Sequence, residues 1–239
     1  MESQLLDTMD IERERGITIK SNAVRVMYDA DDGERYQFNL IDTPGHVDFT
    51  YEVSRSLAAC EGAVLVVDAT QGVEAQTVSN AMLAMNANLD IVPAINKIDL
   101  PSARPEEVRT EIEDVLAIPA DDAVCVSGKT GEGIHELLEA LVYLVSPPKG
   151  DPMAPLKALI LDSYFDQFRG VVATVRVFDG SIKAGDQLLM MQGSTPFLVE
   201  EVGAKRPLEM AVDQLSVGEV GYVVTGLKDP EAVRVGDTL

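Results

Sequence analysis

The pattern of apolar residues changes at a proline-rich stretch, residues 147–152, and this change limits the possible folds most strongly. Before it, short apolar runs alternate with segments of helical periodicity. After it, the helical pattern stops and short strand-like runs follow one another. Clustered Pro and Gly between two such patterns are typical of a linker. We therefore predict two domains, residues 1–150 and residues 151–239, which a length of 239 residues accommodates.

Residues 1–150 have the pattern of an α/β domain. Two segments around a Gly- and Asp-rich turn, 23–28 and 36–41, predict a β-hairpin. Apolar runs at 63–67 and 91–95 predict buried strands. Helical patterns lie between and after them, at 48–60, 74–86, 105–116 and 134–144. Strands that alternate with helices favour a mostly parallel sheet with helices on both faces.

Residues 151–239 predict a small antiparallel β-barrel, because short apolar runs alternate with turn residues. The runs are 156–161, 170–178, 186–191, 197–202 and 218–225. A chain with 46% hydrophobic and 25% charged residues is neither disordered nor collagen-like. No apolar run approaches the roughly 18 residues that cross a bilayer. Two cysteines far apart in sequence suit a reducing compartment, so we expect a cytoplasmic protein.

The charge is strongly acidic, with 40 acidic and 19 basic residues and a net charge of −21. Such a surface repels nucleic acid at long range, which counts against RNA binding by this chain alone. The simpler interpretation is an acidic surface that keeps the protein soluble.

Four short motifs stand in order, and each but the first directly follows a predicted strand. They are Arg15-Gly16-Ile17-Thr18-Ile19, Asp42-Thr43-Pro44-Gly45-His46, Asn96-Lys97-Ile98-Asp99 and Ser127-Gly128-Lys129. Open α/β sheets bind ligands at the carboxyl ends of their strands. Each motif alone arises easily by chance, whereas the four together at strand ends indicate a nucleotide site.

The first two motifs suit phosphate and metal chemistry. Asp42, at a strand end, can hold Mg²⁺ through water, and Thr18 offers it a hydroxyl ligand. Gly45 lets its backbone N–H approach a γ-phosphate without a Cβ in the way. His46 is either a loop histidine without a role or the residue that orients a water for in-line attack on a γ-phosphate, as a glutamine does in GTP-hydrolysing enzymes.

The third motif suits guanine. The Asp99 carboxylate can accept hydrogen bonds from guanine N1–H and N2–H₂, a donor pair that adenine lacks. The Asn96 amide bonds either the base or a neighbouring loop, and the Lys97 stem can cover one face of the base. Ile98 is the spacer that places Asp99.

Two further residues have ordinary structural interpretations. His135 begins a predicted helix, and we expect it to lie on the surface. Cys60 follows Val53 and Leu57 on an apolar helix face, and we expect it in the core rather than in a reactive site.

The chain resembles the translational GTPases, and it is most similar to the elongation factor 4 family, also called LepA. The stretches that carry the resemblance are residues 9–20, 41–49, 51–62, 71–77 and 218–222. The resemblance implies a P-loop-type GTPase domain, with a mostly parallel sheet and helices on both faces, followed by the β-barrel domain II of translation factors. It runs over essentially the whole chain.

The resemblance also implies roles for the motif residues. Thr18 belongs to switch I and Asp42 to switch II, and both serve Mg²⁺. His46 is the catalytic histidine, beside an apolar gate that includes Ile17. Residues implied to bind nucleotide are Thr18, Asp42, Gly45, Asn96, Lys97, Ile98, Asp99, Ser127, Gly128 and Lys129.

The implied function is a ribosome-associated GTPase that binds GTP and GDP and couples hydrolysis to remodelling of the elongating, tRNA-bound ribosome, in back-translocation or elongation fidelity. The implied partners are ribosomal RNA and proteins with bound tRNA, and peripherally the cytoplasmic face of the membrane, without a stable homo-oligomer. Two alternatives stay open. One is another translation-factor GTPase of the elongation factor G or membrane-stress type, and the other is a non-catalytic interaction module, against which the intact motifs argue.

The sequence contains no Gly-x-x-x-x-Gly-Lys-Ser/Thr loop. Gly128-Lys129-Thr130 has the local pattern, but Ala123 stands where the first glycine is required. By resemblance we expect the P-loop, first strand and first helix before Met1 and further domains, which supply much of the ribosome contact, after Leu239. A P-loop holds the phosphates, and the first strand lies mid-sheet. We therefore expect the 239-residue chain to hydrolyse no measurable GTP and residues 1–150 to fold poorly.

Overall fold

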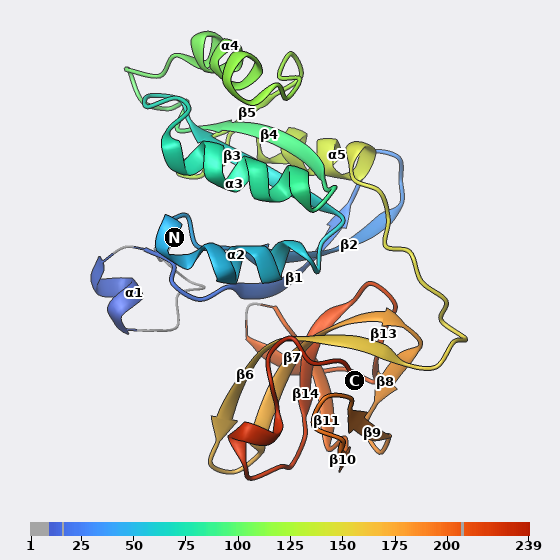
Figure 1. Cartoon of the computed structure of the whole chain (residues 1–239). Coiled ribbons are helices and arrows are strands. Elements are labelled where there is room, and N and C mark those ends of the chain that lie inside the picture. The colour runs from blue at the N-terminus through green and yellow to red at the C-terminus, as the bar shows by residue number, and fades with distance from the viewer. Residues whose placement is uncertain (1–9, 16, 207) are drawn as a thin grey trace. The chain divides into compact units, whose positions relative to one another are not determined.

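The structure is a computed structural model that describes residues 10–15, 17–206 and 208–239 (Figure 1). The chain forms two compact units. The barrel unit comprises the described residues up to Met27, residues 37–43 and residues 147–239. The α/β unit comprises residues 28–36 and 44–146.

A parallel three-stranded sheet organises the α/β unit, in the order β3-β4-β5. Its strands are β3 (Gly62–Asp68), β4 (Asp90–Asn96) and β5 (Val124–Cys125). The helices are η1 (Val47–Phe49), α2 (Thr50–Leu57), α3 (Ala75–Asn86), α4 (Pro105–Leu116) and α5 (Ile134–Leu144). The predicted alternation of strands and helices is confirmed.

Helices cover both faces of this sheet. Leu65 and Val67 of β3 pack in one buried cluster with Ile95 of β4 and with Val108 and Ile112 of α4. Alternate strand residues point to opposite faces. On the other face, Gly62 lies against Val145, directly after α5, and a Cβ at this glycine would come within 2.7 Å of the Val145 methyl groups. The small residue therefore lets the end of α5 approach the sheet closely.

The predicted hairpin consists of β1 (Asn22–Asp29) and β2 (Arg35–Asp42), which form a two-stranded sheet of their own. Its turn is closed by a hydrogen bond from the Ala30 N–H to the Glu34 carbonyl, and Gly33 adopts a φ of 86° there. Within the described ranges, neither strand pairs with the parallel sheet. A short helix, α1 (Asp10–Arg15), precedes the hairpin and was not expected from the sequence.

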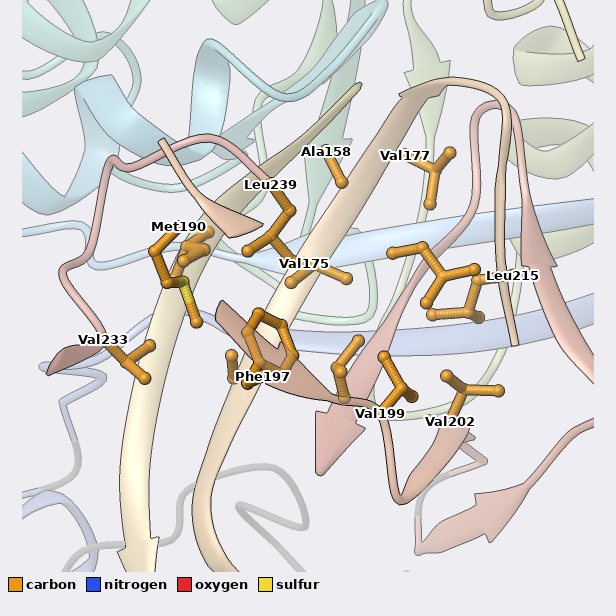
Figure 2. Packing of buried hydrophobic residues seen from close by; sticks show 14 of the residues in the cluster. Ala158, Val175, Val177, Met190, Phe197, Val199, Val202, Leu215, Val233 and Leu239 are labelled. Atoms are coloured by element: carbon orange, nitrogen blue, oxygen red, sulfur yellow. The ribbon is translucent and has the colours of Figure 1, made fainter. Parts of the chain in front are cut away.

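The carboxyl-terminal residues form antiparallel strands around one core, as predicted. Five strands pair in the order β12-β11-β14-β7-β6, and β8-β13 and β9-β10 form two further pairs. Their bounds are β6 (Lys157–Asp166), β7 (Gly170–Asp179), β8 (Ser181–Lys183), β9 (Gln187–Met190), β10 (Thr195–Leu198), β11 (Glu201–Lys205), β12 (Glu209–Ala211), β13 (Gln214–Ser216) and β14 (Val220–Val224), followed by η2 (Pro230–Ala232). Figure 2 shows side chains such as Val175, Met190, Phe197 and Leu215 meeting in the core.

Two predicted elements differ from the structure. The run 197–202 is two strands, β10 and β11, because the chain turns between them where the Val199 N–H bonds to the Asp186 carbonyl. The helix expected at 48–60 begins with the turn η1 and ends at Leu57. Cys60 therefore lies beyond the helix, half-buried, with its Sγ 3.2 Å from the Ser56 carbonyl oxygen, and its expected place on the helix face is wrong.

The helices in the described ranges are all too short or too polar to cross a membrane.

Candidate nucleotide site

The loops that follow β4 and β5, residues 96–99 and 127–130, are tied together by Asn96, and we call them the base loops. The Asn96 Oδ1 accepts hydrogen bonds from the Lys97 N–H (2.7 Å) and from the Gly128 N–H (3.0 Å). Parallel strands end at the same edge of a sheet, which places the two loops side by side. Of the two roles that the sequence left open for this amide, the structure shows the bond between loops.

Asp99 is fixed by a buried serine. The Ser127 Oγ donates a hydrogen bond to the Asp99 Oδ1 (2.8 Å) and accepts one from the Thr130 N–H (3.1 Å). Ser127 is fully buried, and the Lys129 Nζ lies 3.9 Å from the Asp99 Oδ2. Each carboxylate oxygen has two lone-pair sites, so Asp99 keeps acceptor capacity while its orientation is set. Asp99 and Ser127, which belong to two different sequence motifs, are therefore in direct contact.

Lys97 is held by an aspartate that sequence reasoning missed. Its Nζ lies 2.6 Å from the Asp68 Oδ2, and the residue adopts a left-handed φ of 69°. The Asp68 Oδ1 accepts hydrogen bonds from the N–H and hydroxyl of Thr70, both at 2.7 Å. Burial opposes ionisation, but Lys97 and Thr70 outweigh it and hold the pKa of Asp68 well below its usual range. The signal that could have found Asp68 is its position at the end of β3, because it pairs directly with Asn96, the last residue of β4.

His46 lies in a loop, residues 44–49, that we call the His46 loop. Its side chain is 45% exposed, and its Nδ1 lies 3.3 Å from the Asp48 N–H nitrogen and 3.4 Å from the Asp48 Oδ2. The ring meets Phe49 edge-on at 6.2 Å between centroids. The Asp48 N–H and carboxylate therefore both lie on the Nδ1 side of the ring. The neighbouring Gly45 carbonyl accepts a bond from the Asn80 amide of α3 (3.4 Å).

Thr18 and Asp42 belong to the barrel unit, whereas Gly45 and His46 belong to the α/β unit. Asp42 is the exposed last residue of β2, and Thr18 is half-buried in the segment after α1. That segment is anchored by the buried Glu12 carboxylate, which accepts hydrogen bonds from the Ile19 and Lys20 N–H groups, both at 2.9 Å. A hydroxyl and a carboxylate are hard oxygen donors that fit Mg²⁺. Gly16 of the first motif lies outside the described residues.

His135 lies on the surface as expected, with 55% of its side chain exposed. Its hydrogen bonds join the hairpin turn to α5.

Comparison with known proteins places the chain among translation factors. The elongation factor Tu GTP-binding domain family matches residues 1–147, and the elongation factor Tu domain 2 family matches residues 170–239. Elongation factor 4 of Staphylococcus saprophyticus subsp. saprophyticus is 59% identical over 239 residues, and that of Staphylococcus aureus (strain JH1) is 58% identical. Each alignment covers 100% of this chain and 39% of the relative, so the chain spans about two fifths of the length of these relatives.

Among solved structures, a bacterial selenocysteine-specific elongation factor, EF-Sec, is similar to the chain with a TM-score of 0.79 at 21% sequence identity. The match covers 98% of this chain and 40% of that structure. It establishes a shared fold.

Proposed function

The chain belongs to the family of elongation factor Tu GTP-binding domains, and on this premise we propose that the whole protein is a ribosome-associated GTPase of the elongation factor 4 type. Relatives named elongation factor 4, at 58–59% identity along the entire chain, favour this function over an elongation factor G type. The proposal includes GTP hydrolysis coupled to remodelling of the tRNA-bound ribosome. A GTPase domain over residues 1–150 and a domain II over 151–239 stay part of the same proposal.

The observation that carries the proposal is the Asp99 carboxylate, held in place by the buried Ser127 hydroxyl. A carboxylate whose orientation is set before the ligand arrives loses little freedom on binding, so it discriminates by its acceptor pattern. Guanine presents two adjacent N–H donors to it, and adenine leaves it desolvated and unpaired. The Lys97 stem, pinned at its far end by Asp68, is in turn available to cover the base.

His46 would act on the attacking water. An imidazole with its Nδ1 engaged by the Asp48 backbone presents Nε2 as the group that meets the water. Thr18 and Asp42 would hold Mg²⁺, which on binding supplies positive charge to the phosphate oxygens. Gly45 would offer its N–H to the γ-phosphate.

The phosphate contacts of this site are incomplete within the 239 residues, because the sequence contains no P-loop motif. We therefore expect fluorescent GDP and GTP, with Mg²⁺, not to bind the chain alone at high micromolar concentration. The net charge of −21 opposes RNA contact by these residues, so the proposal assigns most ribosome contact to other parts of the protein. A cytoplasmic location with peripheral membrane contact belongs to the proposal as well.

The test uses a chimera in which this chain replaces the 239 matching residues of the S. saprophyticus elongation factor 4. Asp99→Asn should move its preference from GTP toward XTP, because the amide presents a donor where the carboxylate accepted. Ribosome-stimulated hydrolysis of the two nucleotides gives the selectivity ratio. Asp121→Asn, the same charge change at an exposed loop position, should leave the ratio unchanged. A GTP/XTP ratio that Asp99→Asn does not alter contradicts the assigned role.

A further inference from the structure

Three potential metal ligands meet where the hairpin turn approaches α5, and we call them the turn–helix cluster: Asp31, His135 and Glu139. Asp31 lies in the turn between β1 and β2, and the other two lie four residues apart on α5, which places them on one face of the helix. One ligand atom from each side chain lies within 4.8 Å of the other two. The His135 Nε2 is 3.2 Å from the Asp31 Oδ2. All three belong to the α/β unit, and none belongs to a nucleotide motif.

The Tyr28 hydroxyl contacts two members of this cluster, Glu139 and His135. It donates a hydrogen bond to the Glu139 Oε1 and lies 2.9 Å from the His135 Nδ1. Because the phenol O–H donates its hydrogen bond to Glu139, the phenol oxygen can only accept one from the His135 Nδ1–H. In the neutral form of this imidazole, Nδ1 then carries the proton and Nε2 carries the lone pair.

That lone pair faces a carboxylate oxygen. Two acceptors at 3.2 Å repel each other unless a proton or a cation lies between them. Glu139 adds a second carboxylate, which is oriented by the Asp31 N–H through a 3.0 Å bond to its Oε1. In the described part of the chain, Tyr28 and the Asp31 N–H both donate to Oε1 of this carboxylate, which leaves Oε2 to meet a cation.

We propose that Asp31, His135 and Glu139 bind a divalent transition-metal cation of the zinc type. One imidazole nitrogen with two carboxylate oxygens is a donor set of Zn²⁺ sites, whereas Mg²⁺ prefers oxygen ligands alone. Two carboxylates balance the ionic charge, and a chain of net charge −21 attracts cations. Tyr28 supplies the outer hydrogen bond that metal-bound histidines require. The His135 and Asp31 side chains are 55% and 72% exposed, so the cation enters from solvent.

A bound cation would join the hairpin turn to α5. Its ligands come from two elements that are more than 100 residues apart in the chain, so binding favours the folded form alone. Zn²⁺ should therefore raise the melting temperature of the α/β unit. This consequence is independent of nucleotide, because the proposal does not rest on the GTPase function.

Isothermal titration with ZnCl₂ tests the proposal, on the 239-residue chain and in parallel on the chimera, so that the folding of the shorter chain does not decide the outcome. One Zn²⁺ should bind per chain. His135→Asn, Asp31→Asn and Glu139→Gln should each weaken it by more than about tenfold, and Tyr28→Phe by about tenfold. Glu136→Gln, the same charge change one residue from His135, and His46→Asn, the loss of the other histidine, should leave the affinity unchanged.

Several results would overturn the site. Equal zinc affinity before and after His135→Asn is one, and loss of binding only on replacing Cys60 and Cys125 is another. Co²⁺ should give a visible spectrum without a thiolate charge-transfer band. If Zn²⁺ leaves the melting temperature unchanged while acidification strengthens the His135–Asp31 pair, a proton rather than a metal ion joins the two groups and the proposal is wrong.

Discussion

The base loops and the His46 loop lie in the same α/β unit, yet hydrogen bonds hold them to different extents. In the base loops, the Asn96 and Ser127 side chains are bonded on both sides, and Ser127 is fully buried. In the His46 loop, the imidazole is 45% exposed and its side-chain partner within hydrogen-bonding range is the neighbouring Asp48.

This difference suits the roles that we propose for the two loops, base binding for the base loops and γ-phosphate sensing for the His46 loop. The base is the same in GTP and GDP, so a site built in advance binds both with little ordering cost. The γ-phosphate is present in only one of them, and a loop that reports it must change its interactions when that group leaves. Under the proposed function, the base site is formed in advance at the ends of the strands, whereas the His46 loop completes its contacts only when the γ-phosphate binds.

The largest expected effect comes from the exposed histidine. In the chimera, His46→Ala should slow ribosome-stimulated GTP hydrolysis by about 100-fold or more, because the attacking water loses the group that orients it. Single-turnover rates and GTP affinity measured together separate chemistry from binding. Affinity should stay near normal, since the base loops are untouched. An unchanged rate removes His46 from the mechanism.

Two variants test the difference between the base loops and the phosphate-binding residues by comparing their affinities for GDP and GTP. Ser127→Ala frees Asp99 and should weaken GDP and GTP equally, by roughly tenfold, because both carry the same base. Thr18→Ala should weaken GTP in the presence of Mg²⁺ and spare GDP. Fluorescent-nucleotide titrations of the chimera give the four affinities. Equal losses for both nucleotides in Thr18→Ala, or unequal losses in Ser127→Ala, break the distinction between the two regions.

The smallest effect concerns the ion pair that holds Lys97. The folded-state pKa of Asp68 lies below its unfolded value near 3.8, so its stabilisation is present above that pH and is lost as the pH falls further. Asp68→Asn should therefore cost no more than about 1 kcal/mol of unfolding free energy at pH 5, and less at pH 3. Urea unfolding of the chimera at the two pH values measures the difference. A cost that grows on acidification has the wrong sign for this pair.

Local signals predicted most elements of the fold. The predicted helices at 105–116 and 134–144 coincide with α4 and α5, because a proline and acidic residues open the first and an apolar stripe marks the second. The hairpin followed from two alternating runs around a Gly-containing turn. Strands such as β8, β12 and β13 are three residues long, too short for a pattern of alternating apolar residues. Whether these residues form strands depends on the strands with which they pair.

The sequence by itself determined the order of the motifs, including the one proposed to bind guanine, and which residues lie at the strand ends, since a strand end is a local feature that neighbouring residues encode. The tertiary structure alone decided that Asp68 holds Lys97, that Asn96 joins two loops, and that Asp31 meets His135 and Glu139. Apart from the pair within α5, these contacts join residues that lie between 29 and 108 positions apart in the chain. A local sequence pattern cannot predict contacts over such separations. They exist because strand register and helix packing bring the segments together.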